Sequence, residues 1–253
     1  MLRRGMAGAL LAAGLALAAI ASVPVARAQE KPQIEAEAAR VLTAALERIE
    51  KATSFTFHAE VTNDAPLPSG QKVQFPGTLE VAVRRPNGLW NMFEGEQRIA
   101  RSWYDGKTFT LLNGGKNVYA CSPAPEKLDD LLGTMKEKLG FTPPLAPLLR
   151  ENLVATALAK ITSGYVVGRG VIGETRCLHL AFRGKKTDWQ FWISEHGEPI
   201  IRRIVITYKL EPGAPQFAAT FLSWDFAPSL SDAVFTFTPP QGAVQCEFEP
   251  VMR

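Results

Sequence analysis

The sequence has few of the residues that build metal centres and catalytic sites. It contains three cysteines and three histidines in 253 residues, and they are not spaced as zinc ligands are. The motifs G-x-S-x-G and H-E-x-x-H are absent, and His58-Ala59-Glu60 lacks the Pro-Cys-x-x-Cys partner of zinc deaminases. The carboxylates Glu60 and Glu80 fall on the polar sides of their strands. We therefore expect no metal, no cofactor, no catalytic residue and no enzymatic activity.

The chain also lacks a surplus of one charge once its first residues are set aside. It has 28 Lys+Arg and 25 Asp+Glu, but Arg3, Arg4 and Arg27 lie in a starting segment without acidic residues. Without these three arginines the counts are 25 and 25. Because a nucleic-acid-binding protein normally has a basic surplus, we expect no nucleic-acid partner.

A long hydrophobic run occurs only at the start of the chain. The uncharged run Gly5–Ala26 follows Arg3-Arg4 and ends in Ala26-Arg27-Ala28, which is the pattern of a secretory signal peptide. We expect residues 1–28 to be removed by cleavage after Ala28, with an uncleaved membrane anchor as the alternative. The absence of a later run of membrane length predicts a periplasmic protein without a stable membrane span.

Removal of 28 of the 253 residues leaves 225, which is enough for one domain, 29–253, with a single core. An oxidising compartment permits one disulfide among Cys121, Cys177 and Cys246, in any of three pairings. The sequence does not choose among these pairings.

Hydrophobic periodicity divides the mature chain into helices and strands. Apolar residues recur at helical spacing over 33–52, and from Ser54 the period becomes two, which indicates a strand. Short turns separate further strands at 79–83, 89–93, 99–104, 108–112 and 117–120, as in an antiparallel meander.

The strand pattern stops for about forty residues and then resumes. Two helices are expected in an insert at about 123–162, one from Leu128 to Leu139 and one from Leu145 to Ile161. The later strands are expected at 165–171, 176–182, 189–193, 201–208, 217–226 and 234–237. The predicted fold class is α+β, with eleven or twelve strands in a curled antiparallel sheet that forms a barrel or half-barrel.

The segment Gly168–Gly173 matches the dinucleotide fingerprint G-x-G-x-x-G. A strand follows it instead of a helix, so no helix N-terminus is available to bind a pyrophosphate. We expect these glycines to form a hairpin turn and a bulge.

Three segments, in order, resemble the periplasmic lipoprotein-carrier superfamily that includes LolA and LolB. They are Val83-Arg84-Arg85-Pro86-Asn87, Tyr104-Asp105-Gly106-Lys107-Thr108 and Phe235-Thr236-Phe237-Thr238-Pro239-Pro240-Gln241-Gly242-Ala243. Together they span nearly the whole mature chain. Later segments, such as Asp188-Trp189-Gln190-Phe191-Trp192, are more similar to an uncharacterised predicted-periplasmic branch of that superfamily.

The resemblance implies an unclosed β-barrel whose concave apolar face is capped by a helical lid and receives lipoprotein acyl chains. It also implies that Arg85 holds the lid closed. Strand alternation agrees, because Leu79, Val81 and Val83 share the parity of Arg85. The alternative is a turn arginine in solvent, since Pro86 can end the alternation.

Candidate ligand-binding residues follow from this implied cavity. They are Phe55, Phe57, Leu79, Val81, Trp90, Phe93 and Trp103 on the strands, and Leu131, Leu132 and Met135 on the lid. If the lid leucines pack permanently, they are ordinary core residues instead.

The leading hypothesis is a non-enzymatic periplasmic protein that binds the acyl part of a lipid or lipoprotein, with a carrier as one form of this function. The alternative is an envelope sensor or scaffold that regulates a protein partner, because the superfamily also uses this fold in that way. A hydrolase acting in the same cavity is a third reading.

Overall fold

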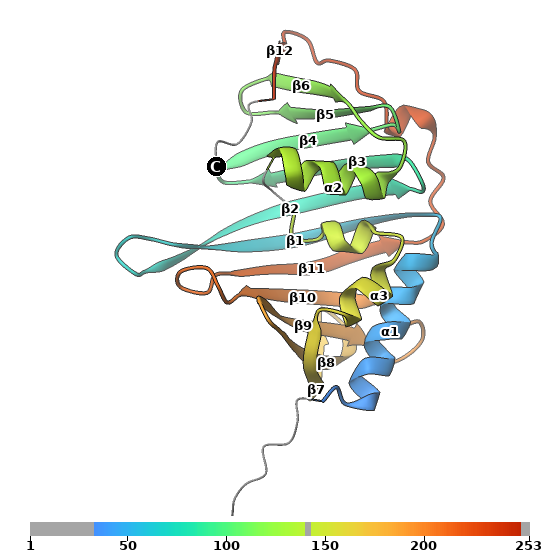
Figure 1. Ribbon diagram of the computed structural model, residues 1–253, viewed down its shortest axis with the longest axis vertical. Helices are drawn as coiled ribbons and strands as arrows, with labels where there is room; N and C mark the ends of the chain where they lie inside the picture. Colours follow the sequence, from blue (N-terminus) through green and yellow to red (C-terminus); the bar gives the residue numbers. More distant parts are fainter. Residues whose placement is uncertain (1–32, 140–142, 249–253) are drawn as a thin grey trace, which may run out of the picture. The chain divides into compact units, whose positions relative to one another are not determined.

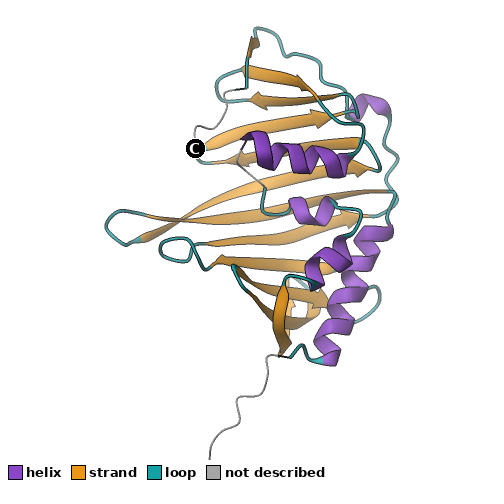
Figure 2. Ribbon diagram, viewed as in Figure 1, coloured by secondary structure: helices purple, strands orange, loops and turns teal. Residues whose placement is uncertain are grey.

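The computed structural model of the protein describes residues 33–139 and 143–248. The expected signal peptide, 1–28, lies outside these residues. Twelve strands form one curled, unclosed sheet, and three α-helices lie against one of its faces (Figures 1 and 2). The expected α+β half-barrel is thereby confirmed. In the two described stretches, no helix has both the length and the apolar character needed to span a membrane.

The sheet consists of two antiparallel meanders, β1 to β6 and β7 to β11, and one short parallel strand, β12. Its strands are β1 (Ser54–Pro66), β2 (Lys72–Arg84), β3 (Gly88–Gly95), β4 (Arg98–Tyr104), β5 (Thr108–Asn113), β6 (Val118–Pro123), β7 (Ile161–Ile172), β8 (Thr175–Gly184), β9 (Thr187–Ser194), β10 (Ile201–Tyr208), β11 (Gln216–Asp225) and β12 (Val244–Cys246). Their order is β12-β6-β5-β4-β3-β2-β1-β11-β10-β9-β8-β7. Pairing of β1 with β11 joins the two meanders, and β12 and β7 form the edges.

The first helix, α1 (Ala36–Lys51), is the amphipathic helix that the sequence predicts. Its buried stripe consists of Ala38, Val41, Leu42, Ala45, Leu46 and Ile49. Burial of each large side chain in this stripe contributes about 1.5–3 kcal/mol, which holds the helix against the sheet. The chain before the helix is tied to β7, where Glu35 N donates to Gly164 O at 2.9 Å.

The helical insert contains α2 (Leu128–Leu139), the short 3-10 helix η1 (Ala146–Leu149) and α3 (Leu153–Leu158). The expectation of one helix over 145–161 is therefore wrong. Pro147 is the second residue of the 3-10 turn, and Arg150 has extended backbone angles (φ −74°, ψ 148°) that end it. The predicted helix also runs too far, because Ile161 already belongs to β7.

The C-terminal segment differs from the expected strand at 234–237. A 3-10 turn, η2 (Asp232–Val234), stands there, and Phe235 is buried against the sheet. The strand in this part of the chain is β12, which pairs in parallel with β6. Periodicity did not indicate β12 because it has only three residues, all exposed.

The glycine-rich segment 168–173 forms the β7–β8 hairpin, as predicted. The turn is Gly173-Glu174, and Gly173 has φ +56°, a backbone conformation that favours glycine. A register shift between Val166 and Gly168 marks the bulge.

Candidate ligand-binding site

A cavity of about 580 Å³ lies between the helices and the later strands; we call it the α3 cavity. Its floor consists of side chains from β9 and β10. Ile204 is paired with Phe191, and Ile206 with Trp189. Because paired residues on antiparallel strands share a face, these four side chains form one apolar patch. The volume lies within the range of small-molecule sites, roughly 300–1,000 Å³.

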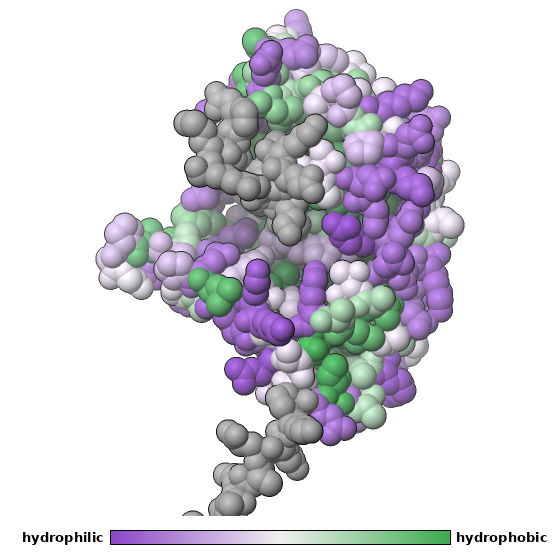
Figure 3. All heavy atoms as spheres, viewed as in Figure 1, coloured by the Kyte–Doolittle hydropathy of each residue, from purple (hydrophilic) through white to green (hydrophobic). Residues whose placement is uncertain are grey.

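The wall and roof of the α3 cavity come from α1 and the insert. Leu42 and Leu46 of α1 form the wall. The roof residues are Pro143, Pro144, Leu145, Pro147, Leu148, Leu153, Thr156, Ala157 and Ala159. Many of these side chains are small or cyclic and reach less far than leucine or phenylalanine, so they leave space above the floor. Figure 3 shows a recess on this face, with hydrophilic side chains at its rim and hydrophobic ones over the α1 and α3 end.

The mouth of the α3 cavity is polar. The lining residues there are Lys160, Ile161, Thr162, Lys185, Lys186, Thr187 and Tyr208. Burial, assisted by the charge of Glu211, raises the pKa of Tyr208 to about 12. The phenol is therefore neutral at physiological pH and supplies a hydroxyl that can both donate and accept a hydrogen bond.

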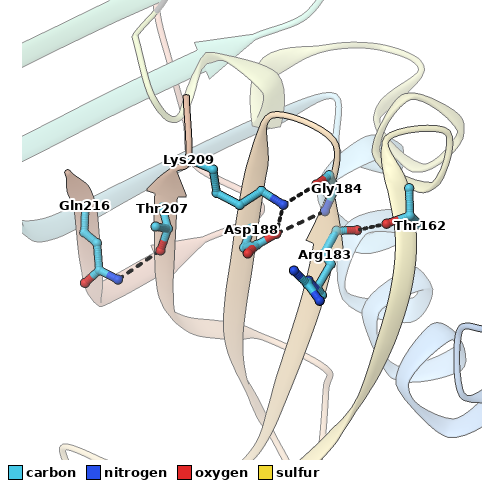
Figure 4. A network of polar contacts seen from close by, with 7 residues as sticks. All are labelled: Thr162, Arg183, Gly184, Asp188, Thr207, Lys209 and Gln216. Carbon is cyan, nitrogen blue, oxygen red and sulfur yellow. Dashed lines mark hydrogen bonds and ion pairs between the residues drawn. The ribbon is translucent and has the colours of Figure 1, made fainter. Parts of the chain in front are cut away.

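A polar network holds the β8–β9 turn at this mouth (Figure 4). Lys209 Nζ donates to Gly184 O at 2.5 Å and forms an ion pair with Asp188 Oδ1 at 2.8 Å. The same Asp188 oxygen accepts the backbone N–H of Gly184 at 3.3 Å. Thr162 Oγ1 donates to Arg183 O at 3.0 Å, which ties β7 to β8. These contacts fix the backbone on both sides of the turn.

Arg85 joins the sheet to both α1 and the insert. Its Nη1 donates to Leu149 O in η1 at 2.5 Å. Its Nε donates to Ala52 O at 3.2 Å and its Nη2 to Ile49 O at 3.5 Å, both at the C-terminal end of α1. Burial lowers the pKa of Arg85 despite the nearby carboxylates of Glu151, Asp129 and Glu50. The guanidinium therefore lies on the helix-covered face and binds backbone carbonyls there, as strand parity predicted.

The predicted cavity residues of β1 to β3 lie in the packed core. Phe55, Phe57 and Val81 are buried, and Leu79 and Phe93 are partly buried against the same cluster. None of them lines the α3 cavity. Their contact with a ligand stays a prediction.

The structure places Trp90 and Trp103 on the opposite face of the sheet. These two residues are paired with each other, whereas the neighbouring pair Leu89 and Tyr104 belongs to the core under the helices. Successive residues of a strand point to opposite faces, so Trp90 and Trp103 point away from the helices. The Trp103 ring lies 4.9 Å from that of Phe237 in the C-terminal segment. The prediction that Trp90 and Trp103 lie on the concave face is therefore wrong.

The predicted lid residues lie on α2. Leu131 and Leu132 are buried, and Met135 packs partly buried against the core. Leu128 N donates to Pro86 O at 2.8 Å, which fixes the start of α2 next to Arg85. These residues cover the half of the sheet away from the α3 cavity.

Sequence reasoning missed the residues that form the α3 cavity. The alternation of Trp189 with Phe191 and of Ile204 with Ile206 and Tyr208 is visible in the sequence and marks one apolar face of each strand. It does not show that the roof over these strands is too small to fill the space.

The three cysteines are all free, so none of the three possible disulfides is formed. In the part of the chain that the structure describes, no group of three His, Cys, Asp or Glu side chains is arranged to hold a metal ion.

Comparisons with known proteins identify a family and similar folds. A family model described as "Predicted periplasmic protein (DUF2092)" matches residues 38–249. The crystal structure of LprF from Mycobacterium bovis is similar at 16% identity and a TM-score of 0.49, over 85% of this chain and 100% of that chain. No curated protein matches the sequence.

Two further solved structures are similar. One is a LolA superfamily protein from Nitrosomonas europaea, with 12% identity, a TM-score of 0.36, and coverage of 79% of this chain and 97% of that chain. The other is a chain of the MucA/MucB complex of Pseudomonas aeruginosa, with 14% identity, a TM-score of 0.43, and coverage of 80% and 62%.

Proposed function

Since the chain belongs to the DUF2092 family of predicted periplasmic proteins, we propose that it is a non-enzymatic periplasmic protein that binds the acyl part of a lipid or lipoprotein. The observation that carries this proposal is the α3 cavity, whose floor and wall are apolar and whose volume is about 580 Å³. Except for Thr156 of the roof, its polar lining residues gather at the mouth. An elongated ligand with one apolar end and one polar end matches this distribution.

The burial of an acyl chain supplies enough free energy for binding. Each methylene group removed from water contributes about 0.8 kcal/mol, so about ten methylenes contribute roughly 8 kcal/mol before the entropic cost of binding. Leu148 and Leu153 of the roof and Leu42 of the wall supply the contacts that replace water around the chain.

Arg85 is proposed to hold the roof over the cavity. Its bond to Leu149 O connects β2 to the 3-10 helix that carries the roof residues Pro147 and Leu148. A charged donor on a partly buried carbonyl typically contributes about 1.5–3 kcal/mol. That energy is small beside the burial of a chain, so a ligand can displace the roof reversibly.

A chain-length series tests the proposal. Saturated fatty acids of increasing length are titrated while the tryptophan fluorescence of the protein, to which the floor residue Trp189 contributes, is recorded. We expect about fourfold tighter binding for each added methylene, since 0.8 kcal/mol corresponds to that factor, until the cavity is full. Affinity that does not depend on chain length would contradict binding in an apolar cavity.

Two substitutions on α3 form a matched pair for this titration. Ala157 lines the cavity, whereas Ala155 is exposed on the same helix and does not. Ala157→Trp is expected to fill the cavity and reduce affinity at least tenfold (about 1.4 kcal/mol), while Ala155→Trp leaves affinity unchanged. Equal affinities of the two variants would place the ligand elsewhere.

A second candidate function, regulation of an envelope protein, is favoured by the edge strand β7. Tyr165, Val167 and Val171 on this strand are 54%, 48% and 62% exposed. Residues 33–35 already bind this edge at Gly164 and Val166, but its part beyond Val166 can accept an extended segment of a partner protein as an additional strand. A stable protein complex that forms without lipid, and is lost in a Val167→Asp/Val171→Asp variant, would support this function over the first.

A further inference from the structure

The mouth of the α3 cavity carries charge of one sign. Lys160, Lys185 and Lys186 line it, and the lining residues include no Asp or Glu. Lys185 and Lys186 are exposed, and within residues 33–139 and 143–248 neither has an ion-pair partner. Positive charge at one end of an apolar cavity attracts the negatively charged end of a ligand.

The turn that carries Lys185 and Lys186 is held in place before any ligand binds. It is the two-residue connection between β8 and β9. The Lys209 ammonium binds Gly184 O next to it (Figure 4). The backbone N–H of Lys209 also donates to Lys186 O at 3.1 Å. Asp188, the carboxylate next to the turn, is neutralised by Lys209. It therefore does not compete with a ligand for the two lysines of the turn.

We propose that the α3 cavity selects amphiphiles with an anionic headgroup; this inference rests on the proposed function. Lys185 and Lys186 bind the headgroup at the mouth, while the acyl chain lies over Trp189 and Phe191. The shared chemistry is one acyl chain joined to a phosphate or a carboxylate. A lysophospholipid supplies the phosphate, and a free fatty acid supplies the carboxylate.

The test separates recognition of the chain from recognition of the headgroup. The neutral fluorophore N-phenyl-1-naphthylamine is bound to the wild-type protein and displaced by palmitoyl lysophosphatidylglycerol, palmitoyl lysophosphatidylcholine or palmitate, each below its micellar concentration. The first two share a phosphate and a chain, but only lysophosphatidylglycerol carries a net negative charge. Palmitate distinguishes a carboxylate source from a phosphate source.

We expect lysophosphatidylglycerol to bind about tenfold more tightly than lysophosphatidylcholine (about 1.4 kcal/mol), because its net negative charge pairs with two exposed lysines. The preference should fall below about twofold in a Lys185→Gln/Lys186→Gln variant and should weaken as salt screens the charges. A Lys107→Gln/Lys116→Gln variant removes the same charge from two distant exposed turns and should retain the preference.

Each other outcome has a distinct meaning. Equal affinity of the two lysophospholipids for the wild-type protein would overturn headgroup selection and leave the proposed function standing. A preference that survives in Lys185→Gln/Lys186→Gln would also overturn the assignment to these lysines. Failure of all three lipids to displace the fluorophore would overturn the proposed function itself.

Discussion

The helix-covered face of the sheet has two halves, one under α2 and one under η1 and α3. Under α2, Leu128, Leu131 and Leu132 are buried in the same cluster as Val83 and Leu89. Under η1 and α3, the side chains of β9 and β10 border a cavity of about 580 Å³. Both halves have the same alternation of apolar residues along their strands. The difference therefore comes from what covers them.

The two covers differ in length and in side-chain size. α2 has 12 residues and presents leucines to the sheet, whereas α3 has six residues and follows a 3-10 turn that contains Pro147. Its cavity-lining side chains include Thr156, Ala157 and Ala159. A sheet that curves away from a short helix with small side chains leaves space that only a ligand or water can fill.

Replacing a leucine by alanine in α2 or in η1 should give the largest difference between the two halves, measured as the loss of free energy of unfolding. Leu131 is 2% exposed in the packed half, and Leu148, at 6%, lines the cavity. We expect Leu131→Ala to lower the free energy of unfolding by about 2–5 kcal/mol, because it creates a new void. Leu148→Ala should lower it by only about 1–2 kcal/mol, because its side chain already borders empty space.

Urea unfolding monitored by circular dichroism measures both changes. Equal losses of stability in Leu131→Ala and Leu148→Ala would show that the two halves are packed alike, and would remove the distinction on which the cavity rests.

Removal of Arg84, the last residue of β2, and removal of Arg85, which follows it, should affect different segments. Arg84, on the other face, forms an ion pair with Asp232 at 2.7 Å and donates to Leu230 O at 3.3 Å. Arg85→Leu should lower the stability of the roof by about 1.5–3 kcal/mol, since it removes charged hydrogen bonds to Leu149 and to the end of α1. Arg84→Leu should leave the roof unchanged and loosen the C-terminal segment.

Hydrogen exchange followed by mass spectrometry resolves the two effects. Residues 143–158 should exchange at least about tenfold faster in Arg85→Leu, and residues 230–235 should do so in Arg84→Leu. Unchanged protection of 143–158 in Arg85→Leu would reject Arg85 as the residue that holds the roof.

The smallest expected effect is the pH dependence of stability that comes from two tyrosines, one in each half. Burial raises the pKa of Tyr104 to about 12, with Asp105, Asp130 and Glu126 adding to it, and burial raises that of Tyr208 to about 12. Because both folded-state values lie above the unfolded value of about 10, the stability they contribute is complete below pH 10 and is lost as pH rises toward 12.

Alkaline titration followed by phenolate absorbance, with Tyr104→Phe and Tyr208→Phe to assign the signals, sharpens this comparison. A bound acyl chain removes water from the cavity and should raise the pKa of Tyr208 further, while that of Tyr104 stays constant. A ligand that shifts Tyr104 instead would place the binding site under α2.

The sequence predicted the fold in considerable detail. The stripe of α1, the meanders and the hairpin at Gly173 follow from local periods and turn residues, which depend on spacing along the chain. The errors occurred where local signals conflict or are weak. Pro147 interrupts a helical pattern, and β12 exists only because β6 offers it a partner.

The candidate site was less predictable than the fold. The parity of Arg85 placed its side chain on the helix-covered face, but the aromatic residues Trp90 and Trp103 were assigned to the wrong face. The alternation of apolar residues around Trp90 and Trp103 is as regular along the strand as the alternation that contains Val81 and Val83. Without knowledge of which face the helices cover, the pattern does not indicate whether an apolar row meets a helix or the C-terminal segment.

Residue spacing was therefore sufficient for the helices, the strands and the class of fold, because each is encoded within a few neighbouring residues. The location of the cavity required the packed structure. It depends on side chains from α1, the insert, β9 and β10, which are far apart in the sequence, and on the distances at which they meet. A space exists where these side chains together are too short to fill the curve of the sheet, and no single segment carries that information.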